Sequence, residues 1–177
     1  MGEKKRRGRR DYLNDFRQNA AGEYLYTGEH YAFVEQGKSR RRFLTELWLL
    51  CGGALVAAVA AGCIPAAGMD SCFYMLIPYA AGLMGAVSLC WGLGRLTAGG
   101  DPLRAYVYQE TVEKLPSRAA LTAAAAGLTM IGAVIRLICS GFDGKMWDSF
   151  LFLGLEAAVL GLSLLMRGRI HRQTWTK

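Results

Sequence analysis

Residues 43–64, FLTELWLLCGGALVAAVAAGCI, decide the fold of this chain. They contain one charged residue, Glu46 in the first turn, followed by eighteen positions without a charge. An α-helix rises about 1.5 Å per residue, so roughly 20 such residues cross a hydrocarbon core about 30 Å thick. The basic block KSRRR at 38–42 comes directly before them and resists transfer across a membrane. The stretch is therefore predicted to be a transmembrane helix with a fixed orientation.

Three more blocks of the 177-residue chain have the same character. The chain is 53% apolar and 20% charged, and most of the charges lie between the blocks. A soluble domain of this length would instead spread its apolar residues at the period of helices or strands. The sequence thus predicts an all-α membrane protein with four transmembrane helices, at 43–64, 72–93, 119–140 and 149–166.

Lysine and arginine are divided unequally among the polar segments. Eleven lie in 1–42, four in 95–118 and four in 167–177, whereas the loops 65–71 and 141–148 together have only Lys145. Cytoplasmic loops of membrane proteins carry the excess of these residues. Both termini and the middle loop are therefore predicted to be cytoplasmic, and the protein to be a multi-pass protein of a bacterial plasma membrane. Cleavage of the first span as a signal peptide is not expected, because forty-two residues precede it and three spans follow.

The chain thus divides into a basic cytoplasmic segment at 1–42, a transmembrane domain at 43–166 and a basic cytoplasmic tail at 167–177. Aromatic residues alternate on either side of a TGE turn at 27–29, which predicts a β-hairpin at 23–34. An isolated hairpin is marginal in water, so its aromatic recognition face should pack on the membrane interface, on the helix ends or on a partner. That face consists of Tyr24, Tyr26, Tyr31 and Phe33.

The middle loop, 95–118, is predicted to hold a short amphipathic helix on the inner membrane surface. Asp101 is a good N-cap, Pro102 suits the first helical position, and Pro116 closes the element. Apolar residues recur at helical spacing from Leu103 to Val107.

Basic residues near the first span predict contact with anionic lipid headgroups, worth about 1 kcal/mol per residue near the surface. Nucleic acid is not expected as a partner, because lipid is the nearest polyanion. The basic set consists of Lys4, Lys5, Arg6, Arg7, Arg40, Arg41 and Arg42.

Small residues form one stripe on each of the first two spans and predict close contacts between helices. The stripes are Gly53, Ala57 and Ala61 in the first span, and Ala81, Gly85, Ser88 and Gly92 in the second.

The last two spans each carry one polar stripe. Polar residues recur every seven positions there, and residues seven apart share a helix face. The stripes are Thr122, Thr129 and Arg136 in the third span, and Ser149, Glu156 and Ser163 in the fourth.

In the simplest antiparallel register Glu156 faces Thr129, and Arg136 lies about seven residues, or roughly 10 Å, further along. Arg136 and Glu156 lean toward each other along their helices, so we hypothesise an intramembrane pair. Pairing matters because an unpaired charge near the bilayer centre costs about 2.5–3.5 kcal/mol. Three interpretations stay open: a proton or cation relay, a clamp between the two helices, and a contact with a partner's helix. Alternatively, Arg136 could reach the outer face and Glu156 could be protonated.

The motifs give no support to enzyme chemistry. The sequence has no nucleophile elbow, no H-E-x-x-H and no C-x-x-C, and its two histidines, His30 and His171, lie outside the spans. Free thiols are favoured over a Cys63–Cys72 bridge. No enzyme activity, cofactor or metal is therefore expected.

We expect a small integral membrane protein that works by association, as an accessory, assembly or interaction subunit or as a homo-oligomer. Its expected partners are membrane lipids and either another protein or a second copy. The alternative is a small oligomeric transporter or channel that uses Glu156 and Arg136.

Overall fold

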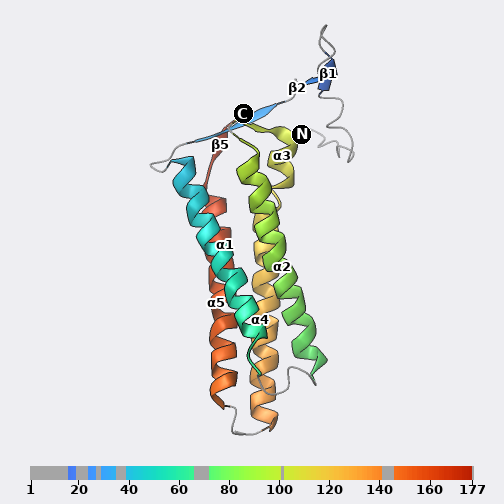
Figure 1. Cartoon of the computed structure of the whole chain (residues 1–177), viewed down its shortest axis with the longest axis vertical. Helices are drawn as coiled ribbons and strands as arrows, with labels where there is room; N and C mark the ends of the chain where they lie inside the picture. Colours follow the sequence, from blue (N-terminus) through green and yellow to red (C-terminus); the bar gives the residue numbers. More distant parts are fainter. Residues whose placement is uncertain are drawn as a thin grey trace, which may run out of the picture.

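Four long helices dominate the computed structural model, which describes residues 16–18, 24–26, 29–34, 39–65, 72–100, 102–140 and 146–176. The helices are α1 (Arg40–Gly62), α2 (Phe73–Ala98), α4 (Leu115–Ser140) and α5 (Met146–Arg172), and they stand side by side (Figure 1). All four are long and apolar enough to cross a membrane, with best windows of mean hydropathy between 1.6 and 2.0. The predicted set of four membrane-spanning helices is confirmed at this level.

The helices continue beyond the predicted apolar spans at one end of the bundle. α1 begins at Arg40 rather than at 43, and α5 ends at Arg172 rather than at 166. A helix satisfies its backbone hydrogen bonds internally, so it does not have to stop where the apolar stretch stops. The extra turns place basic side chains, such as Arg95 and Arg169, beyond the apolar part of the bundle.

Each long helix packs against two neighbours, so the bundle closes in the order α1, α2, α4, α5. Small residues allow the close approach: a Cβ on Gly53 would lie 3.3 Å from Leu162 Cδ1, and one on Gly92 would lie 3.3 Å from Leu115 Cδ2. Most of the predicted small-residue positions therefore face a neighbouring helix, whereas Ala81 faces outward.

A small antiparallel sheet lies across one end of the bundle. Its central strand is β3 (His30–Phe33), and β4 (Leu103–Arg104) and β5 (Trp175–Thr176) flank it. Together with the short helix α3 (Ala105–Glu110), this sheet forms a cap. The N-terminal segment, the middle loop and the C-terminal tail therefore meet at one end of the bundle (Figure 1). Which side of a membrane this end faces stays a prediction.

The strand pairing differs from the single hairpin predicted at 23–34. β2 (Tyr24–Tyr26) pairs with β1 (Phe16–Gln18), whereas β3 pairs with β4 and β5. Two segments distant in sequence thus form hydrogen bonds with the backbone of β3, one on each of its edges. The local turn therefore does not determine which strand pairs with β3. The turn residues 27–28 lie outside the described part of the chain.

Burial of aromatic side chains explains why β3 is placed on the bundle. Phe33 is 9% exposed, and its ring centroid lies 5.5 Å from that of Phe43 on α1 and 5.4 Å from that of Trp175. Tyr31 stacks on Tyr108 at 4.2 Å between ring centroids. These two members of the predicted aromatic face therefore dock on the protein's own helix ends. The side chains of the other two, at 24 and 26, lie outside the described residues.

The middle loop also differs in detail from the predicted amphipathic helix. Leu103 is paired with Tyr31 in the sheet and is fully buried, so the helix begins only at Ala105. Pro116 does not end this element but sits in the first turn of α4, where its missing N–H costs no hydrogen bond. The apolar side of α3 is thus covered by the protein rather than by lipid, as the burial of Val107 shows.

Candidate functional site

Two of the three residues in each predicted polar stripe face the interior of the bundle. Thr122 and Thr129 on α4, and Glu156 and Ser163 on α5, are each at most 3% exposed. Four polar side chains in the membrane-spanning interior are the natural candidates for a site, because buried polar groups within a bilayer are costly and usually have a function.

The two threonines of α4 bond within their own helix. Thr122 Oγ1 donates to the carbonyl oxygen of Arg118, and Thr129 Oγ1 donates to that of Ala125, both at 3.0 Å. Bonds of this kind satisfy a hydroxyl without joining two helices. Ser163 Oγ is buried and has no hydrogen-bond partner among the residues that the structure describes. Among the described residues, the hydroxyls of Thr122, Thr129 and Ser163 therefore do not connect α4 to α5.

Glu156 lies beside the aromatic residues that fill the half of the bundle away from the cap. Its side chain is 3% exposed and interacts electrostatically with Tyr79 of α2. Tyr79 Oη donates to the carbonyl oxygen of Ala58 on α1 at 2.8 Å, and its ring centroid lies 6.2 Å from that of Phe152. Glu156 thus lies where α1, α2 and α5 meet.

Arg136 and Glu156 are not brought together as the hypothesised pair. Within the described segments, the ion pairs do not include one between these two residues. Arg136 is half-buried near the end opposite the cap, where it interacts electrostatically with Tyr74 of α2. The half-buried Ser149 is the outermost member of the other stripe. Arg136 lies about two helical turns from Glu156 but close to the end of the bundle. Its long side chain therefore reaches the end of the bundle more easily than it reaches Glu156.

The basic residues at the start of α1 do not all point to lipid. Arg40 Nη2 reaches across to α2 and donates to the carbonyl oxygen of Leu96 at 3.4 Å, whereas Arg41 and Arg42 are exposed. The other members of the predicted basic set, at 4–7, lie outside the described residues.

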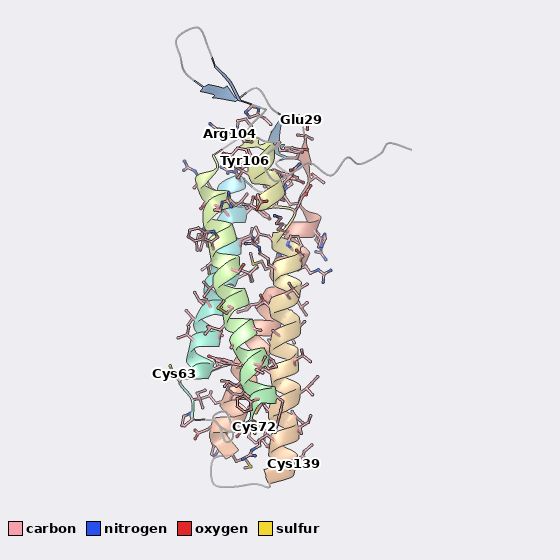
Figure 2. All side chains as sticks on the ribbon, turned by 90° about the vertical axis from the view of Figure 1, so that its right-hand side faces the viewer. Glu29, Cys63, Cys72, Arg104, Tyr106 and Cys139 are labelled. Atoms are coloured by element: carbon pink, nitrogen blue, oxygen red, sulfur yellow. The ribbon has the colours of Figure 1, made fainter. Side chains whose placement is uncertain are left out.

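Two thiols meet between α1 and α2, which the sequence does not predict. Cys51 Sγ lies 3.0 Å from Cys90 Sγ, and both cysteines are free. Cys63, Cys72 and Cys139 are also free, and Figure 2 shows them at the end opposite the cap. The same view places Glu29, Arg104 and Tyr106 at the cap. The buried thiols of Cys51 and Cys72 fill space as small apolar residues, whereas Cys63 and Cys139 are exposed.

The outward face of α5 has a second feature, a group of small residues on the side opposite the polar stripe. Gly154, Ala157 and Ala158 are exposed and Gly161 is half-exposed, all on the side opposite Glu156. A Cβ on either glycine would meet no atom within 4 Å. The four-residue spacing of small residues was visible in the sequence, and its position opposite the buried stripe could have identified it as an outer face.

No three His, Cys, Asp or Glu residues gather into a metal-binding group in the part of the chain that the structure describes. No protein-family model matches the chain, and neither a curated protein nor a solved structure matches it. The candidate sites are therefore the buried Glu156 and the outward face of α5, and each is argued from its own geometry.

Proposed function

We propose that the protein is a non-enzymatic integral membrane protein that works by association, and that the outward face of α5 binds another membrane-spanning helix. The partner helix belongs to a second copy of this chain or to another subunit. In this proposal the cap lies in the cytoplasm of a bacterial cell, as the distribution of lysine and arginine indicates.

The observation that carries the proposal is the shape of the α5 surface at mid-membrane. Gly154, Ala157, Ala158 and Gly161 leave the backbone accessible there, and large residues border them toward both ends, Phe150 among them. Small residues allow two helix backbones to approach closely, which is how transmembrane helices associate when lipid and side chains are equally apolar.

The outward face of α4 provides the contrast. It presents Leu128, Ile131 and Ile135, which are 57%, 58% and 48% exposed and which suit contact with acyl chains. Contact with acyl chains does not require small residues. The composition of the α5 face is therefore explained by a protein neighbour rather than by lipid.

Gly161→Leu tests this proposal, with Gly52→Leu as the matched control. Both glycines have open space at the Cβ position, and both lie about three turns from the cap end of their helices, Gly52 on α1. We expect Gly161→Leu to weaken association about tenfold or more, because the added side chain holds the partner backbone away, equivalent to at least about 1.4 kcal/mol. Gly52→Leu should leave association unchanged.

Two measurements cover both kinds of partner. Energy transfer between copies carrying donor and acceptor tags, at increasing lipid dilution, reports self-association. Co-purification from native membranes reports another subunit, and it counts only if Gly52→Leu retains that subunit and Gly161→Leu loses it. A wild-type protein that stays monomeric in both measurements, or equal losses for the two variants, would overturn the proposal.

A further inference from the structure

A groove of about 480 Å³ lies on the outward face of α2 close to the cap. Its volume is within the range of about 300–1,000 Å³ that small-molecule sites occupy. The groove is separate from the α5 face, because it belongs to another helix. Its lining residues are Val87, Cys90, Trp91, Gly94, Arg95 and Ala98.

The positions of these residues recur at three and four, so they form one stripe along α2. Gly94 has no side chain to fill the middle of the stripe, and a Cβ there would meet no atom within 4 Å. The Trp91 ring, which is 70% exposed, and the exposed Arg95 side chain border that gap. The groove thus exists because Gly94 leaves open space beside two long side chains.

The chemistry of the groove changes along its length. Away from the cap it is apolar, with Val87 as the lining residue farthest from the cap. At the cap end it has Arg95, the basic residue in the last turn of α2. A ligand that fits both parts has a hydrocarbon chain and, at one end, a negative charge.

The surroundings of Arg95 carry an excess of positive charge. Arg118 lies beside α2, since its Nη1 donates to the carbonyl oxygen of Ser88 at 3.2 Å. Arg95 and Arg118 both act electrostatically on Glu110, which forms its ion pair with Lys114 at 2.6 Å. Three cations thus surround Glu110, and Glu113 is the other carboxylate of this segment, so a positive excess remains that an anion at Arg95 would balance.

We propose that this groove binds a phospholipid with an anionic headgroup, with the phosphate at Arg95 and one acyl chain along Trp91 and Val87. The exposed Trp91 ring suits this depth, because tryptophan favours the boundary between headgroups and hydrocarbon. Charge complementarity identifies the occupant: a partner helix would fill an apolar groove without needing Arg95. This site differs from the predicted basic set, of which the described residues lie on α1.

The test is native mass spectrometry of the full-length protein in detergent, titrated with phosphatidylglycerol or with phosphatidylcholine. The wild type should bind the first phosphatidylglycerol about fivefold more strongly than phosphatidylcholine, the effect of about one basic residue near the surface. Arg95→Gln should remove this preference. Arg167→Gln should retain the preference for phosphatidylglycerol. This variant removes an exposed arginine of α5 that also lies near the cap end of the bundle.

A second pair of variants tests the groove rather than the charge. Gly94→Leu should weaken binding of both lipids, because its side chain occupies the path of the acyl chain. Gly168→Leu is the matched control, since Gly168 also has open space and lies equally near the cap end of its helix. Equal binding of the two lipids by the wild type, or equal effects of Arg95→Gln and Arg167→Gln, would overturn the proposal. So would a change in oligomeric state of Gly94→Leu alone, which would identify a protein as the occupant.

Discussion

Glu156 distinguishes association from transport at the scale of a single residue. Glu156→Gln keeps the shape of the neutral acid but cannot exchange a proton or carry a charge. Because α5 associates through its opposite face in our proposal, we expect this variant to keep its association and to melt at the same temperature or higher in detergent. A buried amide costs less to desolvate than a carboxylate. The measurements are thermal unfolding and energy transfer between tagged copies.

The same variant tests the alternative function in liposomes. Under association, wild type and Glu156→Gln should both give the proton and cation flux of empty vesicles. Flux through the wild type that Glu156→Gln abolishes, while Ser163→Ala retains it, would establish transport instead. Ser163 is the suitable control because it is buried on the same face of α5, one stripe position away.

The sequence predicts which helical positions are buried, but it does not predict which residues of different helices meet. Helical periodicity is enough to place Thr129 and Glu156 on inward faces, because burial of a stripe follows from the 3.6-residue repeat. It does not predict what a long side chain contacts, and Arg136 interacts electrostatically with Tyr74 of α2 rather than forming an ion pair with Glu156. It also cannot predict that Cys51 and Cys90 meet, because their contact depends on the register of α1 against α2.

At the scale of elements, the contact between α2 and α4 depends on Gly85. A Cβ at this position would collide with the Thr122 hydroxyl and would lie only 3.4 Å from its Cα. Gly85→Ala should therefore force the helices apart and lower the free energy of unfolding by about 1–3 kcal/mol, as overpacking does. Gly52→Ala should be neutral or slightly stabilising, because it adds helix propensity where no atom lies within 4 Å. Thermal unfolding in one detergent compares the two; equal melting temperatures would contradict the close contact.

The long helices and the strands differ in how far the sequence determines them. A membrane span is encoded within about 20 consecutive residues, so four apolar blocks suffice to predict four helices. A strand is defined by its partner, and His30–Phe33 finds its partners at 103–104 and 175–176. The hairpin pattern at 23–34 contains no information about those distant segments. Contact between α4 and α5 is close as well: a Cβ on Gly127 would lie 3.5 Å from Leu160 Cδ1.

At the scale of the whole molecule, the cap links the three polar parts of the chain at one end of the bundle. β3 belongs to the N-terminal segment, β4 to the middle loop and β5 to the C-terminal tail. Gln173 adds a further link, because its Nε2 donates to the carbonyl oxygen of Val34 at 2.8 Å. The strand pairing thus fixes the N-terminal segment and the C-terminal tail, each of which would otherwise be joined to the bundle by one covalent connection. A folded surface at this end of the molecule therefore depends on the last residues of the chain.

Removal of residues 174–177 tests this dependence. The truncation deletes β5 and the Trp175 ring, which contacts Phe33 at 5.4 Å and Tyr108 at 5.8 Å between centroids. The remaining pairing of β3 with the two-residue β4 is marginal by itself, so the amides of 30–33 should exchange with solvent at least about tenfold faster. The amides of α1 and α4 should keep their protection, because the core of the bundle is untouched. Removal of Lys177 alone is the control and should change nothing. Unaltered exchange at 30–33 after the longer truncation would mean that β3 is held by its contacts with α1 and not by the C-terminal strand.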